Sequence, residues 1–306
     1  MTRRTTQPAL TAAPALVRVH RKNRIASWCA NHEALAFDET PGSPWVLLPS
    51  DARAAFDRIS SAGIPMAESG IGRPTLGVKS GCNEAFIVPP EAVECEMLRP
   101  LIRGENMSPW CVPPSSERII WTHDESGRPL RTLPPRALAL LSGFRRVLES
   151  RSDARGQHRW WSLFRTEAAD FSRPRVVWSD VSRSPKAALL ARGDNSVPIN
   201  SCYVVRCRTL DDALTLTALL NSPIVAAWLN CLAEPARGGY HRYLGWTMSI
   251  LPLPRDWSRA TRLLAPLAAR AIEGSPPTPE NLNATALDAY RLCENDVEPL
   301  MKWAAL

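Results

Sequence analysis

One stretch is the most informative about the fold, and we call it the deciding stretch: Leu76-Gly-Val-Lys-Ser-Gly-Cys-Asn-Glu-Ala-Phe-Ile-Val88. Its first half holds two glycines with a lysine, a serine and an asparagine, and its second half is the apolar run Ala85 to Val88. This pattern predicts a polar turn that leads into a short buried strand. Glycines allow the backbone to approach a ligand closely, and Lys79, Ser80 and Asn83 supply donors for phosphate oxygens or base edges. An ordinary hairpin loop is the alternative interpretation.

The same region contains an imperfect phosphate-binding loop between Gly72 and Ser80. Val78 separates Gly77 from Lys79, whereas the motif needs these two residue types adjacent so that the lysine reaches the phosphates. We therefore expect no nucleoside-triphosphate site in this loop.

The composition indicates a globular, basic protein. The 306 residues are enough for one large domain or two smaller ones, and apolar residues make up 45% of them. The net charge of +7 favours a polyanionic partner over an acidic one.

The cysteines and the N-terminus bear on metal binding and location. The eight cysteines include no CxxC pair, and the five histidines do not fall at metal-ligand spacing, so no zinc site is expected. No apolar core follows Arg3 and Arg4 as in a signal peptide, and no apolar run approaches the length of a membrane span. We expect a cytoplasmic protein with reduced thiols and no membrane partner.

Short strands and helices follow one another without a regular alternation. Apolar runs predict strands over residues 15–20, 85–88, 118–121, 175–178 and 201–205. Helical periodicity and end signals predict helices over residues 51–62, 136–151, 213–220, 224–232, 258–273 and 283–303. The expected fold is α+β, with mixed short strands interspersed with helices and a helical segment at the C-terminus.

The positive charge is concentrated in one segment. Between Arg128 and Arg192 there are fourteen Lys or Arg and five Asp or Glu, a local charge of +9, so the rest of the chain carries about −2. The guanidinium of arginine forms paired hydrogen bonds with phosphates and with guanine edges. The excess of arginine in this segment therefore predicts a surface that binds nucleic acid rather than one that only contacts solvent. The aromatic residues interleaved with it, such as Trp160 and Trp178, are expected in the core.

Several motifs appear in a fixed order across residues 45–255. Gly77 to Val88 resembles the "G-x-x-T/S-G-x-N-x-x-F" loop that opens the C-terminal specificity domain of TaqI-like adenine DNA methyltransferases. Leu98 to Glu105 resembles the "K-P-x-L-x-G-x-D" segment of that domain, with Arg99 for the usual lysine and Glu105 for the aspartate. The remaining matches are Trp160 to Arg165, Asn200 to Tyr203, Leu219 to Ser222 and Leu251 to Pro254.

The resemblance implies that catalysis belongs to a second domain. In that family an N-terminal catalytic domain binds S-adenosylmethionine on a glycine-rich loop and holds the flipped adenine with an Asn/Asp-Pro-Pro-Tyr/Phe motif. None of the Pro-Pro pairs in this chain has both an Asn or Asp before it and a Tyr or Phe after it. The pairs are Val88-Pro-Pro-Glu91, Val112-Pro-Pro-Ser115, Leu133-Pro-Pro-Arg136 and Ser275-Pro-Pro-Thr278. We therefore expect no catalytic residue, no metal and no cofactor in this chain, with S-adenosylmethionine only on a separate catalytic half.

The expected domains follow from the extent of the resemblance. Residues 1–44 would form a tail with a remnant of the catalytic domain's last strand, 45–255 the target-recognition domain and 256–306 a C-terminal helical segment. The implied partners are duplex DNA and a separate methyltransferase catalytic subunit.

The loops and the basic segment together supply the expected DNA contacts. These are Lys79, Ser80, Asn83, Arg103, Arg145, Arg146, Arg151, Arg155, Arg159, Arg175, Arg237, Tyr240 and Arg242. The alternatives are a complete methyltransferase or nuclease subunit with unrecognised motifs, or a protein-interaction subunit of a restriction or phage-defence complex. The latter would use the 237–243 loop and the C-terminal helices.

Overall fold

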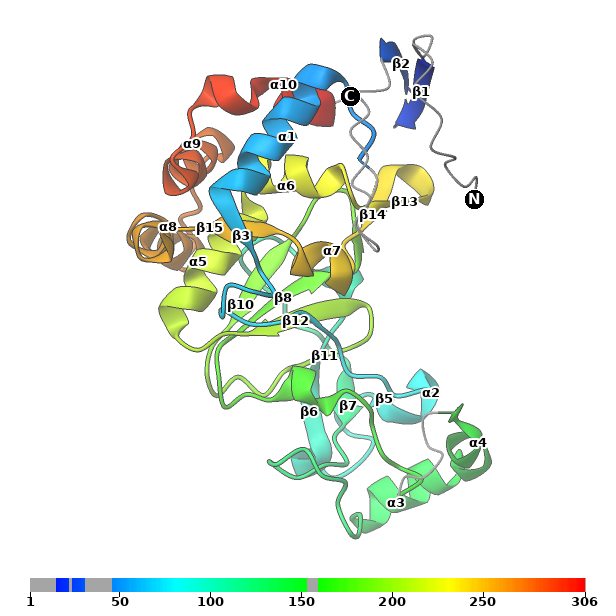
Figure 1. Ribbon diagram of the computed structural model, residues 1–306. Coiled ribbons are helices and arrows are strands. Elements are labelled where there is room, and N and C mark those ends of the chain that lie inside the picture. Colours follow the sequence, from blue (N-terminus) through cyan, green and yellow to red (C-terminus); the bar gives the residue numbers. More distant parts are fainter. Residues whose placement is uncertain (1–14, 22–23, 31–45, 153–158, 306) are drawn as a thin grey trace.

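The computed structural model describes residues 15–21, 24–30, 46–152 and 159–305 (Figure 1). Helices and short strands are interspersed along the chain, which confirms the predicted α+β class. The α-helices are α1 (Ser50–Ala62), α2 (Asn83–Phe86), α3 (Pro135–Ser142), α4 (Arg145–Ser150), α5 (Leu210–Asn221), α6 (Pro223–Asn230), α7 (Gly245–Ser249), α8 (Trp257–Ile272), α9 (Pro279–Tyr290) and α10 (Glu294–Ala305).

The strands form small sheets rather than one large one. The central sheet has the order β10 (Ala187–Leu190), β8 (Arg175–Ser179), β12 (Cys202–Arg206) and β4 (Thr75–Leu76). A second sheet has the order β11 (Val197–Pro198), β6 (Leu98–Ile102), β7 (Arg118–Ile120) and β5 (Ile87–Val88). The smaller sheets are β13 (Glu234–Ala236), β14 (Tyr240–Arg242) and β9 (Val181–Ser182); β15 (Pro252–Pro254) and β3 (Gly63–Pro65); and β1 (Ala15–Arg21) and β2 (Arg24–Ala30).

The central sheet is buried on both faces and separates two hydrophobic cores. Successive side chains of a strand point to opposite faces. In β8, Val176 and Trp178 enter the core beneath the helices, whereas Val177 enters the core shared with the second sheet. In β12, Val205 enters the core beneath the helices, and Val204 enters the core shared with the second sheet. Burial on both faces explains why these strands are continuous apolar runs in the sequence.

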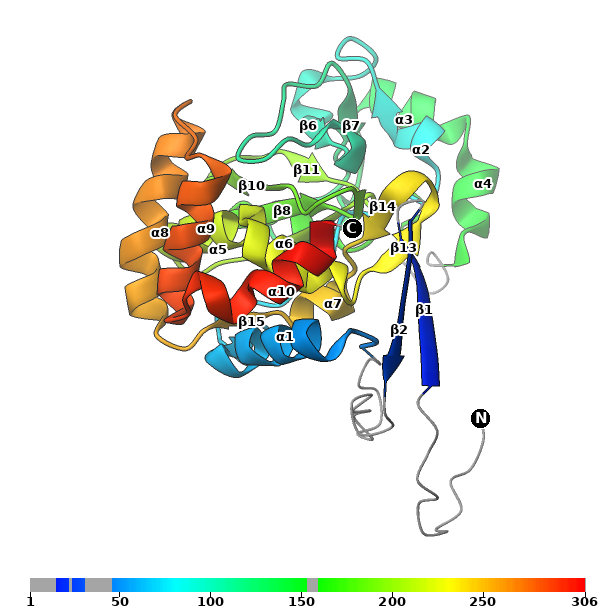
Figure 2. The same ribbon diagram turned by 90° about the horizontal axis from the view of Figure 1, so that it is seen from above.

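The helices α1, α5, α6 and α8 to α10 cover one side of the central sheet (Figures 1 and 2). Their core does not divide at residue 255, because Leu253, Leu264 and Trp303 belong to one cluster. The helix predicted over 283–303 is two helices, since Arg291 adopts a left-handed φ of 58° and ends α9. In the part of the chain that is described, no single helix is long and apolar enough to cross a membrane. The helices α5 and α6, which meet at an angle of 65°, would together have the length and composition of a membrane span.

The deciding stretch differs from its prediction in one respect. Ala85 and Phe86 belong to the short helix α2, so that only Ile87 and Val88 form a strand. Ile87 pairs with Ile119 of β7, while Phe86 is fully buried in the second core. A four-residue apolar run does not distinguish a buried helical turn from a strand, and tertiary packing decided it.

The helix predicted over 136–151 is interrupted at Gly143, where α3 ends. Of the four residues expected on the apolar side of this helix, Leu141 and Leu148 are buried, whereas Leu138 and Val147 are exposed.

The predicted strand over 15–20 is β1, which forms an antiparallel hairpin with β2. Figure 2 shows this hairpin projecting from the body of the molecule. The interpretation of residues 1–14 as a tail concerns positions outside the described residues.

Candidate nucleic-acid interface

The loop before α2 is held by the chain itself. The backbone of Lys79 pairs with that of Phe164 through two N–H···O bonds of 2.9 Å. Ser80 is buried; its Oγ donates to Asn83 Oδ1 at 2.6 Å and accepts from the Cys82 N–H at 3.2 Å. Ser80 therefore shapes the turn and has no free face for a ligand. Asn83 is exposed and Lys79 is half-buried, so these two remain candidates for DNA contact.

The glycines of this loop do permit close approach, but the approaching groups belong to the protein. A Cβ on Gly77 would lie 2.0 Å from the carbonyl oxygen of Ile199. A Cβ on Gly81, whose φ is 68°, would lie 2.6 Å from Cδ of Arg151. The expectation that these glycines make room for a ligand is wrong, because neighbouring chain segments occupy that space.

Arg151 is not available to a phosphate. Its side chain is buried, and its guanidinium donates to the carbonyl oxygens of Leu148 at 2.9 Å, Trp160 at 2.6 Å and Ser80. It also lies over the ring of Phe164, 4.9 Å from the centroid. These contacts join α4 to the loop before α2, and Arg151 is removed from the expected DNA contacts.

Arg175 and Arg103 are also occupied. Arg175 is fully buried at the start of β8 and donates to the carbonyl oxygens of Ala168 and Ser196 at 3.0 Å each. Burial lowers the pKa of Arg175 to about 10, so it remains cationic at neutral pH. Arg103 forms a two-point ion pair with Glu117, with N···O distances of 2.7 and 3.0 Å. The prediction that Arg175 contacts DNA is wrong on grounds of burial, and the charge of Arg103 is already neutralised.

The hairpin of β13 and β14 carries an exposed group of cationic and aromatic side chains. Tyr240 is 39% exposed, and the guanidinium of Arg183 lies 5.4 Å from the centroid of its ring. Arg237 is exposed at the turn, and Arg242 is exposed and pairs with Asp180 at 3.0 Å. We call Arg183, Arg237, Tyr240 and Arg242 the hairpin patch.

The turn of this hairpin requires glycine at two positions. Gly238 and Gly239 both have left-handed φ values, 78° and 76°, which residues with a Cβ rarely adopt. Arg237, Tyr240 and Arg242 of this loop are exposed, whereas His241 is buried.

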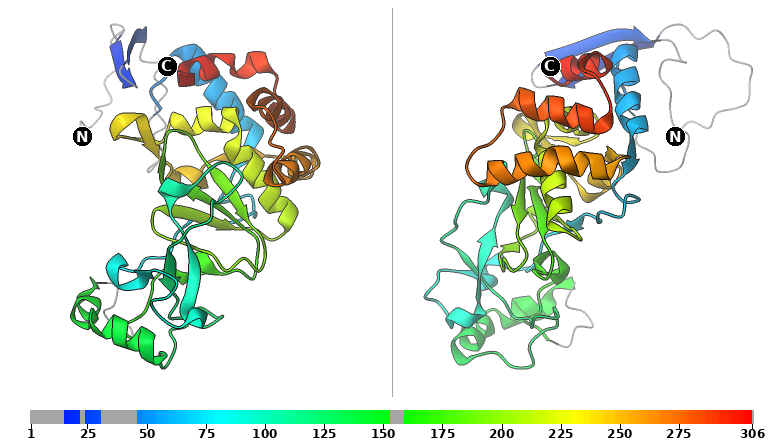
Figure 3. Two further views of the ribbon diagram at one scale, coloured as in Figure 1. Left: turned by 180° about the vertical axis from the view of Figure 1, so that it is seen from behind. Right: turned by 90° about the vertical axis from the view of Figure 1, so that its left-hand side faces the viewer.

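A second exposed group lies on α4. Arg146 is exposed, and Arg145 is exposed with an ion pair to Glu149 at 2.8 Å. Arg159 is half-buried, with its guanidinium 5.6 Å from the ring of Trp161, and Arg155 lies outside the described residues. Figures 1 and 3 show that the hairpin, α2 and α4 lie on one side of the molecule.

The sequence interpretation did not single out Arg183, although it lies in the basic segment. Only the pairing of β9 with β14 brings it to Tyr240, more than fifty residues away, and no local signal reports that pairing. Among the described residues, no group of three or more His, Cys, Asp or Glu is arranged to hold a metal ion.

Comparison with known proteins finds two restriction-modification proteins that this chain resembles, one in structure and one in sequence. The chain superposes with a TM-score of 0.54 on MmeI, a type IIL restriction-modification enzyme solved in complex with DNA, at 13% identity over 79% of this chain and 37% of that one. By sequence it is 26% identical over 243 residues to the type II methyltransferase M.PaeR7I of Pseudomonas aeruginosa, covering 75% of this chain and 40% of that protein. The chain thus spans less than half the length of either protein. No protein-family model matches it.

Proposed function

We propose that this chain is the DNA-binding target-recognition module of a TaqI-like N6-adenine methyltransferase or of a related restriction-modification enzyme. The observation that carries the proposal is the hairpin patch, in which arginines surround an exposed tyrosine at the start of β14. Arginines of this kind bind phosphates and guanine edges, and a tyrosine face stacks on bases. The sequence similarity to a type II methyltransferase supports the same conclusion.

The remaining contacts would come from the same side of the molecule. Lys79 and Asn83 would approach the duplex beside α2, and Arg145 and Arg146 would contact phosphates along α4. Arg159 is partly covered and would contribute only if Trp161 and its neighbours leave an edge of the guanidinium open.

Catalysis would require a separate half. The chain covers 40% of M.PaeR7I and contains neither a glycine-rich cofactor loop nor a Pro-Pro-aromatic motif. We propose that S-adenosylmethionine binds only to that partner, and that this chain supplies DNA recognition in the cytoplasm.

The test measures the affinity for a duplex by fluorescence anisotropy across a salt series. Arg183→Gln/Arg237→Gln should weaken binding and make the slope of log affinity against log salt shallower by up to about two units. The matched control is Arg262→Gln/Arg270→Gln, which removes two exposed arginines from α8. Equal effects of both pairs, or none of either, would contradict the assignment of the hairpin patch.

A further inference from the structure

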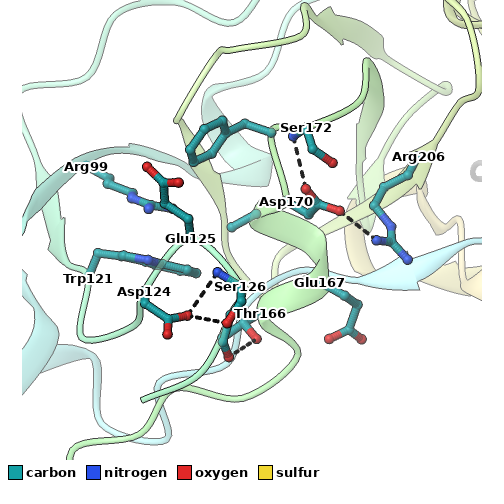
Figure 4. A pocket seen from close by; sticks show the side chains of 13 residues that line it. Arg99, Trp121, Asp124, Glu125, Ser126, Thr166, Glu167, Asp170, Ser172 and Arg206 are labelled. Atoms are coloured by element: carbon teal, nitrogen blue, oxygen red, sulfur yellow. Dashed lines mark hydrogen bonds and ion pairs between the residues drawn. The ribbon is translucent and has the colours of Figure 1, made fainter. Parts of the chain in front are cut away.

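A cavity of about 460 Å³ opens beside β6 (Figure 4). Its walls come from β6, the turn after β7, the 3-10 helix Thr166–Ala169 with the residues after it, and the end of β12. In the second sheet, β7 lies between β6 and the strand β5 that follows α2. No residue of the hairpin patch or of α4 lines the cavity.

Arg99 lines this cavity, and its guanidinium lies against two aromatic rings. Its guanidinium carbon lies 4.1 Å from the ring centroid of Trp121 and 5.2 Å from that of Phe171. Across the described residues the guanidinium makes no hydrogen bond and no ion pair. Burial, with a further contribution from the charge of Arg175, lowers the pKa of Arg99 to about 10, so it is charged at neutral pH.

The neighbouring rings restrict what Arg99 can bind. Ligand atoms in the plane of the guanidinium reach its N–H groups, which favours a flat edge with two acceptors. Arg99 lies in the wall of the cavity. The ligand must enter the cavity.

Two of the four carboxylates in the cavity are already satisfied. Asp124 accepts from the Ser126 N–H at 2.9 Å, the Ser126 hydroxyl at 2.7 Å and the Arg128 N–H at 2.9 Å. Asp170 accepts from the Ser172 N–H at 3.0 Å and from Arg206 at 2.9 Å (Figure 4).

The other two carboxylates, on Glu125 and Glu167, accept no hydrogen bond from any residue that the structure describes. Glu125 lies close enough to Arg99 to stabilise its charge, without forming an ion pair. The cavity therefore offers free acceptors as well as the donors of Arg99, and its surplus of negative charge disfavours a phosphate.

A buried donor adds a second, independent indication of a ligand. Trp121 lines the cavity with only 5% of its surface exposed, and its indole Nε1 finds no partner within the described chain. An unpaired buried N–H destabilises a protein, and a functional site is one of the few settings that accounts for it.

We propose that this cavity binds a guanine base, with the fork of Arg99 on its O6 and N7 atoms and a carboxylate of Glu125 or Glu167 on its N1–H and N2–H₂ groups. Guanine carries two adjacent acceptors on one edge and two adjacent donors on another, which matches an arginine and a carboxylate in one site. Adenine would place its N6 amino donor against the donors of Arg99. The base comes either from a free guanine nucleotide or from an extrahelical guanine of a nucleic acid.

The first experiment is calorimetric titration of the full chain with GMP, AMP, CMP and ribose 5-phosphate. Saturable binding of GMP, at least about tenfold tighter than that of the other three, supports the proposal; one bidentate contact accounts for roughly five- to 150-fold discrimination. Absence of GMP binding at millimolar concentration overturns it. Equal binding of ribose 5-phosphate also overturns it, because Arg99 would then be a phosphate site.

The second experiment uses variants that separate shape from charge. Arg99→Lys keeps the charge and loses the fork, and Glu125→Gln/Glu167→Gln loses the anionic acceptors; both should weaken GMP binding at least about fivefold. Arg131→Gln, an exposed position outside the cavity, should have no effect. Melting curves verify folding, and a variant that does not fold leaves the decision to the ligand series with the unmodified chain.

The third experiment distinguishes the two sources of guanine. The titration is repeated with single-stranded dT10 and with the same strand carrying one central dG. Binding that prefers the dG strand and is lost with Arg99→Lys assigns the site to extrahelical guanine. Binding of GMP without that preference assigns it to a free nucleotide. Loss of duplex binding in the hairpin-patch variant alone would leave both results unchanged.

Discussion

Single residues in the deciding stretch are constrained by their neighbours. Gly81 has a left-handed φ of 68° and lies against Arg151, which in turn holds the carbonyl oxygen of Ser80. Cys82, the next residue, is half-buried and its thiol is free. Two adjacent positions therefore differ sharply in how much change they tolerate.

We expect Gly81→Val to destabilise the protein and Cys82→Ser to have little effect. A β-branched residue at a left-handed φ costs about 1–3 kcal/mol, and its side chain would also displace Arg151. Urea unfolding of both variants measures the difference. Similar midpoints for the two variants would show that the loop is an ordinary surface turn.

His123 provides a test of stability against pH. Burial lowers its pKa from 6.5 to about 4. Between these values the unfolded chain binds the proton and the folded chain does not, so stability is present above pH 6.5 and is lost as the pH falls toward 4. We expect His123→Gln to reduce the fall in unfolding free energy between pH 7 and pH 5 by about 2 kcal/mol. Urea unfolding of the unmodified protein and of the variant at pH 7 and pH 5 measures this difference. An equal fall in unfolding free energy for the two proteins would contradict the prediction.

At the level of elements, α4 divides its arginines between two roles. Arg145 and Arg146 face solvent, whereas Arg151, directly after the helix, fastens it to the loop before α2. A periodic pattern of arginines does not reveal this difference, because it depends on where the chain turns after Ser150.

We therefore expect opposite results from substitutions in this short segment. Arg145→Ala/Arg146→Ala should leave the melting temperature nearly unchanged and make the salt dependence of DNA binding shallower by up to about two units. Arg151→Ala should cost about 1–3 kcal/mol of stability or more, since three carbonyl oxygens lose their donor. Melting curves and anisotropy separate the two effects. A stable Arg151→Ala protein with a shallower salt slope would reverse the assignment.

At the level of the whole molecule, the cationic side chains left for DNA are fewer than the sequence suggested. Apart from the partly covered Arg159, the candidates on the side of the hairpin patch, α2 and α4 are Lys79, Arg145, Arg146, Arg183, Arg237 and Arg242. If these six contact phosphates, the slope of log affinity against log salt should be about −5, and affinity should fall roughly a thousandfold between 50 and 200 mM salt. A slope near zero would favour the protein-interaction alternative.

We also expect that the chain alone neither binds S-adenosylmethionine nor methylates DNA. The sequence contains no glycine-rich cofactor loop or Pro-Pro-aromatic motif, and it corresponds to 40% of M.PaeR7I. Calorimetry with the cofactor should show no heat of binding. Stoichiometric binding at micromolar concentration would mean that an unrecognised catalytic site is present.

Local signals in the sequence were enough for the class of fold and most helices. The start of α1 after Pro49, its end at Gly63 and the apolar strands β8 and β12 follow from residue types within a few positions. The order of weak motifs along the chain indicates a restriction-modification protein, and the similarities to MmeI and M.PaeR7I agree with that class.

Sequence alone therefore determined most helices, the main apolar strands and the basic character of the chain, because these depend on neighbouring residues or on composition. Tertiary structure decided which arginines are free. Arg151 and Arg175 have the same side chain as Arg146, but buried backbone carbonyls surround them and only a folded chain can supply those partners. The same holds for Arg183 beside Tyr240 and for Arg99 between Trp121 and Phe171, contacts made by strands and loops far apart in sequence.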